Sequence, residues 1–436
     1  MSTQADATDD LTGTRVELDI GAVAHGGHCV ARWDGRVVFV RHTLPGERVV
    51  AEITEGAAGA RFLRADAVEV LEAAPGRVEP RCPMSGPGLC GGCDFQHVDL
   101  GVQRDLLGAV VSEQLSRLAG IEREVVVRPP LSDTAADGLG WRTRVTFAAD
   151  PHGHLGLRKH RSHEVIPLDD CPIASPALPR VLDTPWPASR VTAVAGSTGD
   201  RFVAAYDVTG ELPDVDAVGL MADGHRVRGR GWVREEVDGH EFRVGGAGFW
   251  QVHPQAAATL VDAVRRAVEA RPGETMADLY AGVGLFTAFL AEEVGSSGTV
   301  ISVEGDPRAS RDARRNLHGL PQARVVNGDV EQALRRGEVG ERADVVVLDP
   351  PRTGARARVV RRIAALGPRR VVYVACDPAA LARDVKTFGE EGYVLGSLEA
   401  YALFPMTHHV ECVAVLDRVV RSVLRRVPPA HERLRG

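Results

Sequence analysis

The most reactive side chain in this sequence stands at the end of a predicted strand. The run VVYVACDP (371–378) lacks alternation, as a strand buried on both faces does, and Asp377 and Pro378 end it directly after Cys376. A thiolate is a strong nucleophile near neutral pH when its pKa is lowered or a base stands beside it. Because three other predicted strands also end in polar residues, we interpret Cys376 as a nucleophile and not as an inert packing residue.

Two carboxylates are predicted to lie near this cysteine. Asp349 follows the strand ADVVVL and begins a loop whose two prolines fix an extended chain. Glu411 stands near the start of the last predicted strand, in the segment FPMTHHVE. The carboxyl ends of parallel strands face the crevice in which open α/β sheets bind ligands, so Asp349 is predicted to line that crevice.

A glycine-rich turn predicts a nucleotide site at the same end of the sheet. The segment DLYAGVGLF follows a predicted strand and opens a helix, and Gly282 and Gly284 let the backbone approach a ligand closely. The next predicted strand ends in Glu304, which could bind two ribose hydroxyls, and the third ends in the polar run up to Asp329. A dinucleotide and S-adenosylmethionine both fit this pattern. The missing third glycine of the dinucleotide fingerprint and the polar end of the third strand favour S-adenosylmethionine.

These groups together allow one particular methyl transfer. Carbon 5 of uracil is too electron-poor to attack a methyl sulfonium unaided, but addition of a thiolate at C6 gives an enolate whose C5 is nucleophilic. A base must then remove the C5 proton before the cysteine is eliminated, and Glu411 is the candidate.

The chain divides into three predicted regions. Residues 11–72 carry five short β-like runs separated by turn signals, as in a small closed OB-like barrel. Residues 76–245 are mixed α+β, with a helical pattern at 99–120 that could pack on the catalytic domain. From 246 to 436 strands and helices alternate, which predicts a doubly wound, mostly parallel α/β sheet.

Several segments, in the same order along the chain, resemble the RNA uracil-C5 methyltransferases. They are FWQVH, DLYAGVGLF, DPPRTG, YVACDPAALARD and FPMTHHVE, and GRVVFVRHTLPGERV resembles the RNA-associated TRAM barrel. The resemblance implies a class I methyltransferase with Cys376 as nucleophile, Glu411 as general base and Asp349 at the boundary between cofactor and uracil. It also implies four contacts to S-adenosylmethionine: Gln251, Tyr280, Glu304 and Asp329.

Three positions depart from the family pattern. Asp377 and Leu285 stand where asparagines are usual, and His253 stands where an asparagine ends the FWQVN motif. A carboxylate beside Cys376 raises the thiol pKa by like-charge repulsion unless a cation compensates. We therefore predict that activity survives with Asp377, but with a pH optimum above that of an Asp377→Asn variant.

Four other cysteines form a pattern typical of a metal site. Cys82, Cys90 and Cys93 lie in one segment, and Cys171 follows much later. Four thiolates can hold zinc tetrahedrally or a [4Fe–4S] cluster, and their spacing does not decide between the two. The stretch CGGCDFQH resembles the iron–sulfur branch of the uracil methyltransferases, which implies a structural [4Fe–4S] cluster.

Composition places few limits on the partner. The net charge of −7 over 436 residues argues mildly against nucleic acid, yet basic stretches such as LRKHRSH, RVRGRGWVR and the arginine-rich tail could supply local positive potential. No run of about 18 apolar residues occurs, and the polar first ten residues resemble no signal peptide. We expect a cytoplasmic protein with no membrane partner and, by default, a monomer.

The favoured reading is methylation of a uridine in structured RNA, with the target base everted because a thiol cannot reach C6 inside a helix. Within the family, a TRAM barrel together with an iron–sulfur cluster implies 23S rRNA as the substrate, and tRNA is the alternative. Two other enzymes stay open: a methyltransferase acting on another RNA base or atom, and an NAD-dependent iron–sulfur oxidoreductase. A catalytically inactive RNA-binding module is a further class, which intact Cys376 and Glu411 argue against.

Overall fold

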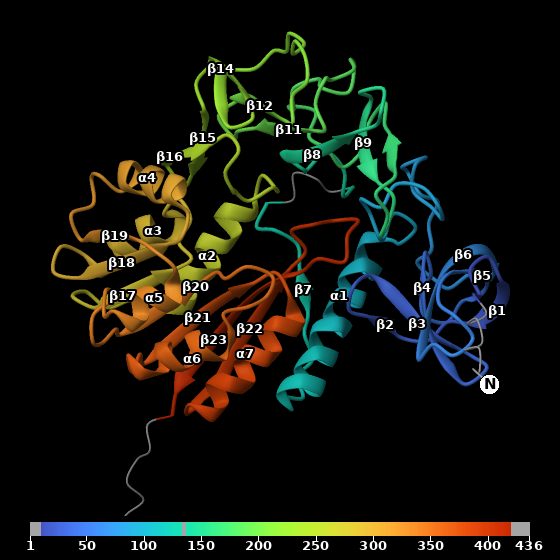
Figure 1. Ribbon diagram of the computed structural model, residues 1–436. Coiled ribbons are helices and arrows are strands. Elements are labelled where there is room, and N and C mark those ends of the chain that lie inside the picture. Colours follow the sequence, from blue (N-terminus) through green and yellow to red (C-terminus); the bar gives the residue numbers. More distant parts are fainter. Residues whose placement is uncertain (1–9, 133–136, 420–436) are drawn as a thin grey trace, which may run out of the picture.

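The structure is a computed structural model that describes residues 10–132 and 137–419 (Figure 1). The arginines of the predicted basic tail from Arg421 onward lie outside this part of the chain. Among the described helices, none is both long and apolar enough to cross a membrane.

The N-terminal unit is a small six-stranded barrel with the strand order β1-β5-β6-β4-β3-β2. Its strands are β1 (Arg15–Asp19), β2 (Val23–Ala24), β3 (His28–Trp33), β4 (Arg36–Arg41), β5 (Arg48–Glu55) and β6 (Phe62–Glu72). Buried and exposed residues alternate in β1 and β5, so their apolar side chains fill the interior. The Gly21 N–H donates to the Val30 carbonyl (2.8 Å) and closes the barrel. The five predicted strands are present. The sixth, β2, has two residues and is too short to show a pattern.

The central unit begins with a helix that reaches the C-terminal unit. Helix α1 (Leu100–Gln114) starts at Asp99, whose side chain accepts hydrogen bonds from the first free N–H groups, and continues as a π-helical turn over Leu115–Ala119. Both segments pack against helix α7 (Pro378–Glu390) of the C-terminal unit. A seven-stranded sheet with the order β10-β9-β8-β11-β12-β13-β14 follows. The remaining elements are β8 (Arg144–Ala149), β9 (Leu155–Arg158), β10 (Val165–Pro167), β11 (Arg190–Ala195), β12 (Arg201–Tyr206), β13 (Gly219–Ala222), β14 (His225–Gly229) and the hairpin β15 (Trp232–Val237) and β16 (His240–Gly245).

The C-terminal unit is an eight-stranded sheet with the order β19-β18-β17-β20-β21-β23-β22-β7. Strand β23 runs antiparallel to both neighbours, and the other pairs are parallel. The strands are β17 (Thr275–Leu279), β18 (Thr299–Glu304), β19 (Ala323–Asn327), β20 (Val345–Leu348), β21 (Arg370–Ala375), β22 (Tyr393–Tyr401) and β23 (Glu411–Arg418). The helices are α2 (Ala256–Val268), α3 (Leu285–Val294), α4 (Pro307–Asn316), α5 (Val330–Arg335), α6 (Arg356–Ala365) and α7 (Pro378–Glu390). This order is that of a class I methyltransferase, so the predicted fold class is confirmed.

One strand of this sheet comes from the predicted central region. Strand β7 (Val127–Arg128) pairs in parallel with the end of β22, where Ala400 and Tyr401 are its partners. A boundary at residue 246 therefore does not contain the whole sheet. Two residues carry no periodic signal, which is why the sequence did not reveal this strand.

Candidate active site

A cavity of about 570 Å³ opens where β17, β20 and β21 end. The order of strands reverses between β17 and β20, which is the place where doubly wound sheets bind ligands. The cavity brings together five predicted site residues: Gln251, Tyr280, Asp349, Cys376 and Glu411. It is also lined by residues to which we had assigned no role in the site, among them Asp94, Trp141, Arg142, His160, Arg352, His408 and His409.

The register of two strands places Cys376 opposite Glu411. Ala375, the last residue of β21, pairs with Cys412 in antiparallel register, so Cys376 lies across from Glu411. Cys376 is half-buried, and Glu411 is only 4% exposed. Burial, together with the charges of Glu411 and Asp349, raises the pKa of Cys376 to about 12. The free thiol is therefore protonated at neutral pH and needs a base or a change of surroundings to react.

The two predicted carboxylates repel each other inside the cavity wall. Burial, followed by the charge of Asp349, raises the pKa of Glu411 well above its ordinary value. Burial and the nearby Asp278 raise the pKa of Asp349 as well. Asp278 is fully buried and accepts a hydrogen bond from the Thr287 hydroxyl at 2.5 Å. A raised pKa makes each ionised carboxylate a stronger base than an ordinary carboxylate, which suits the acceptance of a proton.

Arg352 is the cation that faces these acids. Its charge opposes the upward pKa shifts of both Cys376 and Glu411. Its guanidinium lies 3.2 Å from Nε2 of His409, and burial lowers the pKa of His409 to about 3. His409 is therefore neutral and accepts this hydrogen bond. The sequence places Arg352 directly after the two prolines of the Asp349 loop, but nothing local indicated that it lies near Cys376.

The predicted cofactor residues fall into two groups. Gln251 and Tyr280 line the cavity, and burial with the charge of Asp329 raises the pKa of Tyr280 to about 12. Glu304 is bound to the glycine turn, because one carboxylate oxygen accepts the Gly282 N–H at 2.8 Å.

The glycine turn itself is tightly fixed. Gly284 has φ +90°, and a Cβ there would lie 3.0 Å from a methyl carbon of Leu317, so only glycine fits. Asp329 begins helix α5 by accepting the Gln332 N–H at 3.0 Å. Gly282 and Gly284 form this turn, and Glu304 and Asp329 lie beside it. None of the four is among the residues that line the cavity.

The four predicted metal ligands share one region. Burial, and then the charges of Cys171, Cys90 and Cys82, raises the pKa of Cys93 to about 12. The Gly92 N–H approaches the Cys90 sulfur at 3.4 Å, and the Gln96 side chain approaches the Cys93 sulfur at 3.6 Å. Within the described parts of the chain, no three His, Cys, Asp or Glu side chains are close enough together to hold a metal ion.

The cysteine loop, residues 82–95, supports the segment that carries Glu411. The N–H groups of Asp94 and Phe95 donate to the Met406 carbonyl at 2.8 and 3.0 Å. The Asp94 carboxylate accepts the His408 N–H at 3.1 Å and lies 2.6 Å from His408 Nδ1. The loop between β22 and β23 (red in Figure 1) extends toward the other two units and is held there. Because Asp94 and His408 are 314 positions apart, no sequence signal could have paired them.

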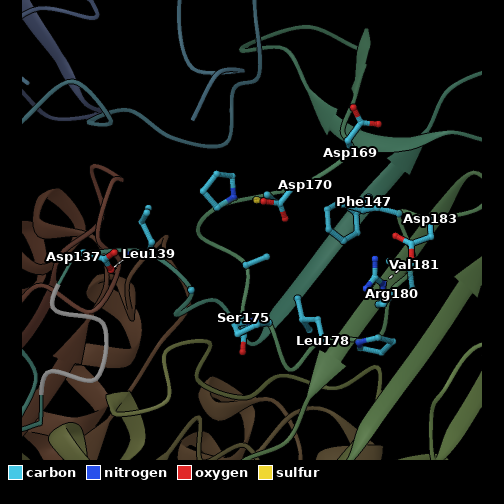
Figure 2. Close-up of a pocket in the computed structure, with 17 residues that line it drawn as sticks. Asp137, Leu139, Phe147, Asp169, Asp170, Ser175, Leu178, Arg180, Val181 and Asp183 are labelled. Atoms are coloured by element: carbon cyan, nitrogen blue, oxygen red, sulfur yellow. Dashed lines mark hydrogen bonds and ion pairs between the residues drawn. The ribbon is translucent and has the colours of Figure 1, made fainter. Parts of the chain in front are cut away.

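A second cavity, of about 610 Å³, lies in the central unit beside Cys171 (Figure 2). Its described lining residues include four aspartates but one arginine, Arg180, which is paired with Asp183 at 2.6 Å. The carboxylates Asp169 and Asp170 come from the segment directly before Cys171 (Figure 2). This acidic lining disfavours a nucleic-acid backbone, and none of the predicted catalytic residues lies there.

The sheet order, the strand-end cavity and the N-terminal barrel define a class I methyltransferase with an appended OB-like barrel. Residues 10–68 match the TRAM domain family, and residues 340–419 match the tRNA (uracil-5-)-methyltransferase family. A protein of Streptomyces avermitilis named as an uncharacterized RNA methyltransferase is 48% identical over 433 residues, which cover 94% of this chain and 100% of that protein. The chain belongs to the RNA (uracil-5-)-methyltransferase family.

A second relative agrees with this assignment, and a solved structure shares the fold. A Bifidobacterium longum protein, also named as an uncharacterized RNA methyltransferase, is 38% identical over 94% of this chain and 99% of its own length. The crystal structure of Pyrococcus abyssi tRNA (uracil-54, C5)-methyltransferase in complex with S-adenosyl-L-homocysteine has a TM-score of 0.69 and 23% identity. That alignment covers 91% of this chain and 99% of the other, so the two proteins share the fold across all three units.

Proposed function

We propose that the protein methylates C5 of a uridine in structured RNA through a covalent adduct between Cys376 and C6 of the base. The observation that carries the proposal is the placement of Cys376 opposite Glu411 in one cavity, which also contains Gln251 and Tyr280. A nucleophile and a base on adjacent strand ends can act on two neighbouring carbons of one ring. Neither hydride transfer nor simple RNA binding needs this pair.

S-adenosylmethionine fits the cavity beside the glycine turn. Tyr280 and Gln251 would contact it from the cavity side, and Glu304 would exchange its bond to the Gly282 N–H for a ribose hydroxyl. Bound there, S-adenosylmethionine supplies an electrophilic methyl group.

In the proposed reaction, the Cys376 thiol first loses its proton to solvent, and Glu411 stays deprotonated for the later step. Its sulfur then bonds to C6, and the electron pair of the C5–C6 double bond moves into an enolate near Arg352. C5 takes up the methyl group, and Glu411 removes the C5 proton. The S–C6 bond then breaks, the double bond re-forms, and Cys376 leaves as a thiolate. Eversion of the uridine from its helix is required for the sulfur to reach C6.

A groove on the barrel supports RNA as the substrate. The barrel groove, about 660 Å³ in volume, is lined by His28, Phe39, Arg41, Arg64, Lys159 and His160 among others. It shares His160 with the candidate active site. Phe39 and the 43% exposed Phe62 meet edge to face, and the Arg64 guanidinium lies over both rings at 5.6 and 5.4 Å from the centroids. Exposed rings and guanidinium planes are surfaces on which unpaired bases stack.

Replacing Phe62 with alanine is expected to weaken RNA binding roughly tenfold, because one stacking surface is lost. Three carboxylates, Glu52, Glu55 and Asp66, offset part of the positive charge in the groove, so stacking is expected to contribute more than phosphate contacts. A filter-binding titration of the Phe62→Ala variant measures the effect. Phe62 packs on the groove residue Phe39, whereas the exposed barrel residue Arg48 pairs with Glu17 and Glu72, so Arg48→Ala is the control. Equal affinities for Phe62→Ala and wild type would contradict this path for the RNA.

We also propose that Cys82, Cys90, Cys93 and Cys171 hold a structural [4Fe–4S] cluster. The effect of Cys171, Cys90 and Cys82 on the pKa of Cys93 indicates that the four sulfurs lie near one another, and N–H groups approach the sulfurs of Cys90 and Cys93, which supports this donor set. A single zinc ion is the alternative, but it requires all four sulfurs within bonding distance of one point. Methyl transfer moves no electrons, so the cluster would have a structural role.

Anaerobic purification is expected to give a brown protein with bound iron and a broad absorbance at about 400 nm. Cys93→Ser should lose both and should also lower the melting temperature, because the neighbouring Asp94 fixes the loop before Glu411. Cys29→Ser, at a buried barrel cysteine that is not one of the proposed ligands, is the control for iron content and absorbance. A protein with neither iron nor this absorbance would exclude the cluster, and stoichiometric zinc would establish the alternative.

The reaction is tested with RNA labelled with tritium at C5 of uridine. We expect release of tritium that depends on S-adenosylmethionine, with 5-methyluridine as the product in nucleoside mass spectrometry. Another methylated nucleoside would favour a methyltransferase acting on a different base or atom. Comparison of total rRNA and tRNA from a deletion strain identifies the substrate, for which 23S rRNA is our first expectation and tRNA the second. We expect a cytoplasmic monomer, which fractionation and size-exclusion chromatography check.

A further inference from the structure

One turn of the barrel lies against the candidate active site from two sides. The barrel turn, residues 25–27 between β2 and β3, places Nε2 of His25 3.1 Å from Oδ2 of Asp377. On the same turn, Gly27 has φ +77°, and a Cβ there would lie 2.9 Å from Cβ of His408. Only glycine allows this close approach. The barrel turn therefore contacts both the start of α7 and the loop that leads to Glu411.

The contact with His25 fixes the residue directly after the proposed nucleophile. Asp377 is the N-cap of α7, and its Oδ1 accepts the Ala380 N–H at 2.7 Å. Both carboxylate oxygens therefore have a partner: Oδ2 contacts His25 of the barrel, and Oδ1 accepts the Ala380 N–H of α7. Burial opposes ionisation, but the bonds from His25 and Ala380 hold the pKa of Asp377 below its ordinary value. Asp377 is thus a fixed negative charge at neutral pH.

Fixed negative charge matters here because Cys376 already has acidic neighbours. Glu411, Asp349 and Asp377 each raise the thiol pKa, and Arg352 lowers it. The neighbouring Cys412 is fully buried and neutral. Asp377 itself faces His25 and Arg383. An Asp377 carboxylate without a hydrogen-bond partner would add more to the electrostatic cost of forming a thiolate, and His25 is the barrel residue that binds this carboxylate.

We propose that His25 is a positioning residue for Cys376, which acts by binding the Asp377 carboxylate at the start of α7. The proposal extends the covalent mechanism proposed above by adding a barrel residue to the reacting centre. The barrel is then part of the catalytic site as well as a surface for RNA. A residue that acts through Asp377 has one signature: its effect disappears when the carboxylate is removed.

A double-mutant cycle with His25→Ala and Asp377→Asn tests this signature. The measured quantity is the rate at which iodoacetamide, an uncharged reagent, alkylates Cys376 between pH 6 and 9 in RNA-free protein, followed by peptide mass spectrometry. His25→Ala is expected to slow alkylation roughly three- to tenfold at each pH, because a thiol pKa raised by one unit leaves tenfold less thiolate. Asp377→Asn should accelerate it, and the double variant should match Asp377→Asn within about twofold.

Two further outcomes keep the test decisive. His25→Gln retains a hydrogen-bond donor for the Asp377 carboxylate and is expected to fall between His25→Ala and wild type. An equal slowing by His25→Ala in both backgrounds, or no slowing in either, would overturn the proposal. Alkylation does not depend on methyl transfer, so inactivity toward uridine would refute the proposed function while leaving this coupling measurable. In turnover assays, the pH optimum of Asp377→Asn should be lower than that of wild type.

Discussion

Cys376→Ala is expected to lower methyl transfer by a factor of about 10⁴ or more and to abolish the covalent RNA adduct. In the proposed mechanism, C5 becomes nucleophilic only after a sulfur has bonded to C6, and alanine leaves no group at the end of β21 to form that bond. The strand end itself should persist, because Asp377 and Pro378 begin helix α7 regardless of the preceding side chain. The loss should therefore be chemical and not structural.

RNA that contains 5-fluorouridine makes this loss visible. Fluorine at C5 cannot be removed as a cation, so the wild-type adduct formed with S-adenosylmethionine should persist as a shifted band in a denaturing gel. Cys412→Ala is the matched control, because Cys412 is the neighbouring buried thiol of β23 and is 0% exposed. Adduct formation or turnover by Cys376→Ala would refute the covalent mechanism.

Glu411→Gln should separate the two halves of the reaction. Glutamine has the same size but cannot accept the C5 proton, so release of product is expected to slow by about 10² to 10⁴. Loss of the Glu411 charge also removes a cause of the raised pKa of Cys376, so adduct formation should not slow. The variant is expected to accumulate a methylated adduct with ordinary uridine RNA, where the wild type shows almost none.

The pH dependence gives a second signature of Glu411. A base works only when it is deprotonated, and burial raises the pKa of Glu411. Release by the wild type should therefore weaken as the pH falls through this raised value, and Glu411→Gln should lack that dependence. Glu399→Gln, in the half-exposed ion pair with Arg266, is the control and should behave as wild type. Product release by Glu411→Gln at the wild-type rate would exclude Glu411 as the base.

Local sequence predicted the strand ends well because their signals are local. Asp377 and Pro378 stop β21 as a helix cap and a first-turn proline do in any context, and the glycines after β17 mark the turn. The contacts that complete the site are of another kind. His25 and Asp377 are 352 positions apart, and Arg352 reaches His409 from another loop. Neither pair has a pattern within its own segment.

The central unit was the least predictable part for a related physical reason. Its sheet includes strands as short as Val165–Pro167 and a parallel pair between β12 and β13, so few residues alternate long enough to indicate pairing. Strand β7 has two residues, and its assignment depends entirely on the partner strand β22. The predicted cysteine loop lies next to the residues that fix the segment before Glu411, a structural role that cysteine spacing alone does not indicate.

The long separation between His25 and Asp377 also sets an order of events during synthesis. A ribosome adds about 5–20 residues each second, so roughly 20–70 seconds pass between the emergence of these two residues. The barrel has all its own strands early and can fold while the rest of the chain is still being made. The contact between its turn and Asp377 can form only after that part of the sheet has been made, so the candidate site is completed much later than the barrel.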